Sequence, residues 1–188
     1  YHDSSRVNCI KWGGDNELIL GSDYLSFWKV MDHFGVFKSV LLWNKRQPKP
    51  VYQIDITNNS QLIASYGKYD HTVKLWKRIS ISGDQVIFTL ILLPHPVSVT
   101  SIYWKKMNYN YLDNNIGGSD NDNIQEQQQQ LQQVENNCYL LYTLCSDKKL
   151  RAWLCLEDDP AHLKIQNWTT LTLNDTTKYC LILDNWII

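Results

Sequence analysis

The chain has 188 residues, of which 44% are hydrophobic and 20% are charged, and its formal net charge is −1. These proportions are typical of a soluble globular protein with an apolar core. The small charge argues against a role that depends on attraction to a nucleic-acid backbone or to an anionic membrane, because neither partner would meet a strongly attractive field.

The first predicted unit begins with the pattern Val-x-x-Ile-x-Trp at residues 7–12. An apolar run follows at 18–20, then an aspartate-to-tryptophan segment at 23–28, then a second apolar run at 36–43. Four short strands joined by turn residues describe one antiparallel sheet of the kind that forms a propeller blade. We therefore predict a first blade over about residues 7–43.

The same order of segments recurs twice further along the chain. Val-x-x-Ile-x-Ile at 51–56 precedes Asp-His-Thr-Val-Lys-Leu-Trp at 70–76, and Val-x-x-Ile-x-Trp at 99–104 precedes Asp-Lys-Lys-Leu-Arg-Ala-Trp at 147–153. A unit that repeats in this way leaves an apolar face bare until a neighbour stacks on it. The repetition predicts an all-β fold, a WD-repeat β-propeller that serves as a binding scaffold.

The repeats set the predicted boundaries of the later blades. We predict a second blade over about residues 51–93 and a third over about 99–173, with the start of a further blade at 179–188. A polar stretch rich in glutamine and asparagine at 105–137 is predicted to be an insertion within the third blade, because it has too little apolar area to offset the entropy of ordering it. The chain is thus expected to hold about three blades of an incomplete propeller, and the protein that carries it is expected to supply the others.

The three aspartate-to-tryptophan segments agree in the faces that they present. Side chains two apart in a strand share a face, so each segment carries small, aliphatic or phenyl groups on one side and the indole with a polar or cationic neighbour on the other. The first set comprises Leu25, Phe27, Val73, Leu75, Leu150 and Ala152. We expect one face of each sheet to pack against the opposite face of the next.

Polar residues of the third repeat resemble the buried hydrogen-bond relay of a WD blade. His95 lies four residues before Val99, where such blades carry the histidine of a Gly-His pair, although proline replaces the glycine here. The predicted relay consists of His95, Thr143, Asp147 and Trp153. A catalytic triad is disfavoured, because these groups would be sealed inside a blade and no oxyanion-stabilising loop is visible.

The other two repeats depart from this pattern. Gln47 occupies the histidine position in the second repeat, and His2 is one residue out of register in the first. The aspartates that open the two segments can still cap their turns by accepting hydrogen bonds from backbone amides. The remaining residues predicted to be structural are Asp23, Trp28, Asp70 and Trp76.

No pattern in the chain predicts a catalytic residue, a metal site or a cofactor site. The five cysteines include no close pair and lack metal-ligand spacing with the histidines, so we expect free thiols in a reducing cytosol. No glycine-rich phosphate loop follows a strand. No apolar segment has the length of a membrane span, so we predict no direct membrane insertion.

Two longer passages resemble a known family. They are Trp-Asn-Lys-Arg-Gln-Pro-Lys-Pro-Val-Tyr at 43–52, which continues through 61–78, and Leu-Leu-Pro-His-Pro-Val-Ser-Val-Thr-Ser-Ile-Tyr-Trp-Lys at 92–105. Together they are similar to the amino-terminal propeller region of the large WD-repeat subunit of the fungal RAVE complex, related to the animal DmX and rabconnectin proteins. The passages span about the middle third of the chain and are more specific than a general WD match.

The resemblance implies a non-enzymatic factor that promotes assembly and reassembly of the vacuolar proton-ATPase and so supports vacuolar acidification. The implied partners are other RAVE subunits, a Skp-type adaptor and peripheral-sector subunits of the V-ATPase. The implied location is cytoplasmic, with peripheral recruitment to vacuolar and endosomal membranes. No motif marks the partner-binding residues, and the loops at 45–49 and 105–137 are the candidate surfaces.

Two other classes of function stay open at this point. One is a WD-repeat adaptor of another pathway, for instance a ubiquitin-ligase substrate receptor or a trafficking coat component. The other is a secreted propeller glycosidase or lectin, which would need paired carboxylates or sugar-stacking aromatic residues. The cysteine pattern and the relay around His95 disfavour the secreted class.

Overall fold

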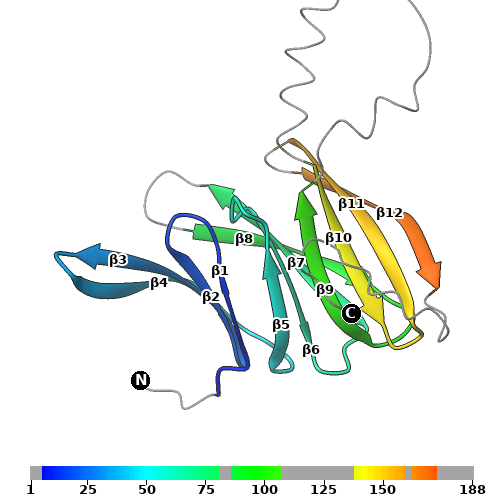
Figure 1. Ribbon diagram of the computed structural model, residues 1–188, viewed down its shortest axis with the longest axis horizontal. Coiled ribbons are helices and arrows are strands. Elements are labelled where there is room, and N and C mark those ends of the chain that lie inside the picture. The colour runs from blue at the N-terminus through cyan, green and yellow to red at the C-terminus, as the bar shows by residue number, and fades with distance from the viewer. Residues whose placement is uncertain (1–5, 81–85, 107–137, 160–161, 173–188) are drawn as a thin grey trace, which may run out of the picture.

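A computed structural model describes residues 6–80, 86–106, 138–159 and 162–172. Every regular element in these residues is a β-strand, and the strands form three antiparallel sheets of four (Figure 1). The predicted all-β fold class is confirmed. The expected insertion, from residue 107 onward, and the expected strand at 179–188 lie outside the described residues.

Each sheet is a meander in which strands that follow one another in the chain pair side by side. The first sheet contains β1 (Cys9–Trp12), β2 (Glu17–Gly21), β3 (Tyr24–His33) and β4 (Val36–Arg46). The second contains β5 (Val51–Ile56), β6 (Leu62–Gly67), β7 (Thr72–Ser80) and β8 (Val86–Pro94). The third contains β9 (Val99–Lys106), β10 (Cys138–Cys145), β11 (Lys149–Asp159) and β12 (His162–Thr172).

The hairpin of β3 and β4 is longer than the sequence pattern indicates. We expected the third strand of the first unit to end at Trp28, but β3 continues to His33. The chain then turns through Phe34 and Gly35 with φ values of 52° and 79°. Positive φ at both central residues suits a tight hairpin turn, because its twist matches that of the strands. The Gly35 amide also donates a hydrogen bond of 2.9 Å to Oδ1 of Asp32.

An apolar cluster joins the first sheet to the second. Leu25 and Phe27 on β3 and Trp76 on β7 are all at most 3% exposed and belong to this cluster. The indole ring of Trp76 lies 5.2 Å from that of Trp43 on β4, in an edge-to-face arrangement. Burying each such side chain is worth about 1.5–3 kcal/mol. The Leu25 face of the first sheet therefore packs on the tryptophan face of the second.

The same arrangement joins the second sheet to the third. Val73 and Leu75 on β7 are fully buried in a second cluster together with Leu141 on β10, and Trp153 on β11 packs against it. Each junction thus pairs the aliphatic face of one sheet with the indole face of the next sheet. This confirms the facing predicted from residue alternation, and it orders the sheets as the chain does (Figure 1).

Asp55 on β5 connects all three sheets. Its carboxylate lies 3.2 Å from Nζ of Lys11 on β1 and accepts a hydrogen bond of 2.6 Å from the amide of Trp104 on β9. Burial raises the pKa of Asp55 above its ordinary value, and the bond from the Trp104 amide and the charge of Lys11 offset this only in part. The carboxyl oxygen is therefore needed as an acceptor more than as a charge.

Gln53 bridges the second and third sheets in a similar way. Its Nε2 donates to the carbonyl of Ile102 at 3.1 Å, and its Oε1 accepts from the amide of Ile102 at 3.3 Å. The hydroxyl of Tyr66 donates to the same Oε1 at 2.9 Å. One side-chain amide thus satisfies both backbone groups of a residue on the neighbouring sheet, which fixes the relative position of β5 and β9.

Replacing Asp55 separates its two roles. Asp55→Ala is expected to lower the free energy of unfolding by about 1–3 kcal/mol, because the buried Trp104 amide loses its acceptor. Asp55→Asn keeps an oxygen acceptor and is expected to cost less than about 1 kcal/mol. Urea denaturation of the three proteins measures both effects. Equal losses for the two variants would contradict the acceptor role.

The stability of the wild-type protein is expected to depend on pH through Asp55. Because the folded-state pKa of Asp55 is raised, its contribution to stability decreases as pH rises above 3.8, the ordinary aspartate value, through the folded-state pKa. The Asn variant lacks this titration, so its stability relative to wild type should improve with rising pH.

Candidate functional site

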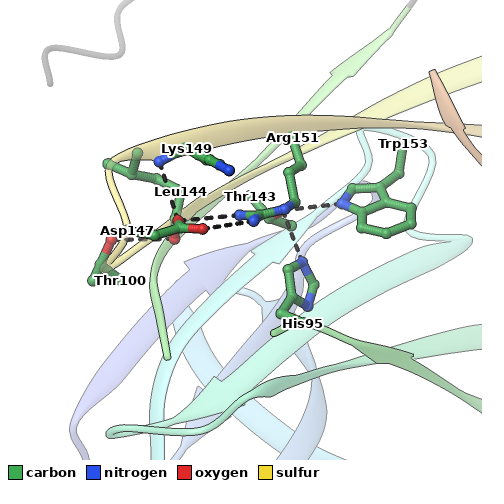
Figure 2. Close-up of polar contacts among 8 residues, drawn as sticks. All are labelled: His95, Thr100, Thr143, Leu144, Asp147, Lys149, Arg151 and Trp153. Atoms are coloured by element: carbon green, nitrogen blue, oxygen red, sulfur yellow. Dashed lines mark hydrogen bonds and ion pairs between the residues drawn. The ribbon is translucent and has the colours of Figure 1, made fainter. Parts of the chain in front are cut away.

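The predicted relay residues of the third sheet lie at its junction with the second (Figure 2). Nε1 of Trp153 donates to Oγ1 of Thr143 at 3.0 Å, and Nε2 of His95 lies 2.9 Å from the same oxygen. Nδ1 of His95 lies 2.9 Å from the carbonyl oxygen of Leu93. The Thr143 hydroxyl on β10 thus links the loop before β9, which carries His95, to β11, which carries Trp153.

The hydrogen-bond partners determine the protonation of His95. The carbonyl of Leu93 can only accept, so Nδ1 carries the proton and Nε2 accepts the hydroxyl proton of Thr143. Burial lowers the pKa of His95 below its ordinary value, which favours this neutral form. The bonds run from Trp153 through Thr143 to His95 with every buried donor satisfied.

Asp147 departs from the predicted relay. Its two carboxylate oxygens lie 2.7 and 3.3 Å from the guanidinium nitrogens of Arg151, and the amide of Lys149 donates to Oδ1 at 3.2 Å. A two-point bond to arginine is stronger than a bond to a neutral imidazole, and it lowers the pKa of Asp147. Asp147 therefore caps the turn between β10 and β11 and pairs with Arg151, while His95, Thr143 and Trp153 bond to one another without it.

The second sheet reproduces part of this arrangement. Nε1 of Trp76 donates to Oγ of Ser65 at 3.0 Å, as Trp153 does to its threonine. At the histidine position, Gln47 donates to the carbonyl of Lys45 at 3.0 Å. Its Oε1 accepts from Nζ of Lys74, also at 3.0 Å, and no bond to Ser65 is formed among the described residues. Gln47 thus bonds to the backbone carbonyl two residues before it, as His95 does, but does not reproduce the bond of His95 to the inner strand.

The two turn aspartates differ in what they bond. Oδ2 of Asp70 accepts from the amide of Gly67 at 3.0 Å, the kind of bond expected for a capping residue. Asp23 is exposed, and the adjacent Ser22 accepts from the amide of Tyr24 at 3.1 Å instead. The cap at the first turn thus comes from the residue before the predicted one.

Trp28 on the first sheet has no hydrogen-bond partner for its buried Nε1 among the described residues. The strand register explains this difference. Ser65 and Thr143 each pair with the residue two before the tryptophan on the next strand. In the first sheet, the residue that pairs in this way is Leu20, which has no hydroxyl group. Leu20 is visible in the sequence, but only the register of β2 against β3 shows that it stands where the other two sheets have a hydroxyl acceptor.

The first sheet exposes its indole face. Ile10, Trp12 and Leu41 are 55%, 61% and 41% exposed, and Trp12 and Leu41 stand in one cross-strand row with Leu18 and Trp28. The corresponding faces of the other two sheets are covered by the preceding sheet. No sheet among the described residues covers this one. It is a contiguous apolar surface of the kind that marks an interaction site.

The chemistry of these residues is that of a framework. Thr143 is fully buried, so a substrate cannot reach its hydroxyl, and burial raises the pKa of the Cys9 thiol to about 11. In the described part of the chain, no group of three or more His, Cys, Asp or Glu side chains is placed to hold a metal ion. Within the same residues, no helix has the length and apolarity needed to cross a membrane. Neither finding tests the predicted absence of a cofactor.

The relay predicts a dependence of stability on pH. Because the pKa of His95 is lowered in the folded state, its contribution to stability is present above 6.5, its ordinary value, and is lost as pH falls through the folded-state pKa. His95→Gln, which copies the second sheet, should remove this dependence. Thermal unfolding at about pH 7.5 and pH 5.5 measures the difference. An unchanged pH dependence in the variant would contradict the neutral relay.

The Trp28 indole, which has no partner among the described residues, predicts that a hydroxyl group placed beside it will raise stability. Leu20→Ser should be more stable than Leu20→Ala by about 1 kcal/mol, because the serine can accept from Trp28. In a Trp28→Phe background the two variants should be equal. Ser65→Ala, which removes the acceptor of Trp76, is the matched control and should cost about 1 kcal/mol. Urea denaturation measures all of them, and an equal difference in both backgrounds would rule out the bond.

Comparison with known proteins finds a match to a WD repeat in part of the chain. The family model "WD domain, G-beta repeat" matches residues 38–77, which run from β4 of the first sheet into β7 of the second. The "Regulator of V-ATPase in vacuolar membrane protein 1" of Saccharomyces cerevisiae is 46% identical over 188 residues, which are 100% of this chain and 12% of that protein. The chain therefore spans about an eighth of the length of this curated relative.

Among solved structures, the "Complex of KlAtg21 with coiled-coil of AgAtg16" is similar at 12% identity with a TM-score of 0.47, over 92% of this chain and 44% of that one. The sequence match confirms the resemblance seen in residues 43–52, 61–78 and 92–105. Residues 38–77 thus match a WD repeat, and the chain is similar to the yeast V-ATPase regulator along its whole length.

Proposed function

We propose that this chain is a non-enzymatic interaction scaffold of a RAVE-type regulator that promotes assembly and reassembly of the vacuolar proton-ATPase. The observation that carries the proposal is the 46% identity, along the entire chain, to a protein named as a regulator of the V-ATPase. The proposed partners are other RAVE subunits, a Skp-type adaptor and peripheral-sector subunits of the V-ATPase. The proposed location is the cytoplasm, with peripheral recruitment to vacuolar and endosomal membranes.

The distribution of buried residues supports a scaffold. Strand β6 contributes to both apolar clusters, and its backbone is paired on both sides, with β5 and with β7. Recognition then falls to loops and to exposed edges, where side chains are not needed for packing. Buried polar groups such as Thr143 bond to one another and to the backbone, which leaves them no chemistry to offer a substrate.

We further propose that the three sheets are successive blades of a larger ring, with boundaries near those predicted from the repeats. The exposed apolar face around Ile10 and Trp12 supports this proposal, because the equivalent faces of the other sheets are covered by a neighbouring sheet. An additional sheet with an aliphatic face would complete the same junction. Closure of the ring would also leave only short, protected strand edges.

Deletion tests the proposed role directly. Removing residues 6–172 from the natural protein is expected to raise vacuolar pH and to reduce co-precipitation of peripheral with membrane-sector V-ATPase subunits. A ratiometric vacuolar dye and immunoprecipitation measure the two effects. The exposed substitution Lys38→Glu, near the start of β4, is the control and should change neither.

Normal acidification in the deletion strain would refute the assembly role. Recovery of ubiquitin-ligase or coat subunits in place of V-ATPase subunits would favour the adaptor class instead.

A further inference from the structure

A groove of about 590 Å³ lies where the first and second sheets meet at one end of their inner strands. Three segments line it: residues 6–8 before β1, residues 49–52 at the start of β5, and Lys68 in the turn between β6 and β7. Nδ2 of Asn8 donates to the carbonyl of Val51 at 3.0 Å, which ties the first segment to the second. The groove is thus built by the junction of two sheets rather than by one loop.

The charge of the groove is positive. Arg6, Lys49 and Lys68 line it, and none of the described residues that line it is acidic. The carboxylate of Asp70 lies 2.8 Å from Nζ of Lys49 and is mostly covered. Lys74 lies close behind, and its pKa is lowered first by burial and further by the charge of Lys49. Four cations and one carboxylate therefore gather here, on a chain whose net charge is −1.

The floor of the groove is apolar. Val7 and Tyr52, each 52% exposed, line it together with the exposed Pro50 and the buried Val51. A free anion gains nothing from such a surface, whereas an apolar side chain gains by displacing water from it. The combination selects a ligand that carries both an apolar group and negative charges.

The turn that carries Lys68 is packed against the segment that carries Lys49. A side chain added at Gly67 would come within 3.1 Å of Cβ of Lys49 and of the carbonyl oxygen of Pro50, and within 2.8 Å of Oδ2 of Asp70. The amide of Asp70 also donates to the carbonyl of Gly67 at 2.9 Å. The walls are therefore formed before a ligand arrives, which reduces the entropy lost on binding.

We propose that this groove binds a segment of a protein partner in which acidic side chains flank an apolar one. Carboxylates of the segment pair with Arg6 and Lys68, and the apolar side chain rests on Val7 and Tyr52. Charge complementarity and the apolar floor together favour this occupant over a phosphate ion or a lipid surface. The inference rests on the proposed function, because it names the chemistry of a partner that the scaffold would hold.

Fluorescence anisotropy of the full chain tests the groove with a defined probe. The probe is a short fluorescein-labelled peptide with Asp and Glu on both sides of a Leu-Phe pair. Arg6→Glu and Lys68→Glu are each expected to weaken its binding by about fivefold or more, since each reverses one charge at the site. Lys38→Glu makes the same charge change far from the groove and should alter binding less than about twofold. Near-UV circular dichroism verifies that the variants fold.

Two further measurements separate the alternatives. A peptide with Ser-Ser in place of Leu-Phe is expected to bind more weakly, and Val7→Asp should weaken the Leu-Phe peptide. If the two peptides bind equally well, or if inorganic phosphate binds as well as the Leu-Phe peptide, the groove is a simple anion site and the proposal is overturned. If phosphatidylserine vesicles bind, the peptide does not, and Lys68→Glu abolishes vesicle binding, the surface binds membranes and the proposal is overturned as well. Absence of peptide binding would also overturn it.

The outcome is distinguishable from that of the deletion experiment. Peptide binding that depends on Arg6 and Lys68 in a protein whose deletion leaves vacuolar pH unchanged would refute the V-ATPase role and keep the groove. Impaired acidification on deletion, with no peptide binding, would refute the groove alone.

Discussion

The packing of the aliphatic face of one sheet against the indole face of the next is the interaction on which the rest of the structure depends. It follows from alternation along the strands β3, β7 and β11, where small or aliphatic residues and tryptophans point to opposite sides. Each sheet alone would expose both faces, so the sheets stabilise one another only as a stack. The same rule explains why the first sheet, with its exposed Ile10 and Trp12, displays an apolar surface.

Polar side chains locate the sheets relative to one another once the apolar faces have met. Asp55 and Gln53 on β5 reach backbone groups of β9, and the His95 ring bonds to Thr143 across the start of the third sheet. Because these groups are buried, a shift of one sheet would leave donors without acceptors. Apolar burial therefore supplies most of the stability, whereas the polar contacts determine a single arrangement.

The division between packed strands and exposed ends bears on function. Among the described residues, the polar groups of the relay are buried, and we propose that loops and exposed faces hold other proteins. The cationic groove between the first and second sheets suits that role, whereas the apolar face of the first sheet suits a further sheet of the same ring. The two differ in chemistry, since one is apolar and broad and the other is charged and narrow, so they suit different occupants.

The all-β class, the facing of the strands and the resemblance to a V-ATPase regulator family can be read from the amino-acid order, because residue alternation and repeated motifs are local properties of the chain. The amino-acid order also pointed to His95, Thr143 and Trp153, which the structure joins by hydrogen bonds. The partners of Asp147 and Asp55, and the lack of a partner for the Trp28 indole among the described residues, emerge only from the folded arrangement of strands and sheets. A buried polar atom takes whichever partner the register of paired strands and the contact of separate sheets bring near, and neither is encoded by the spacing of residues along one strand.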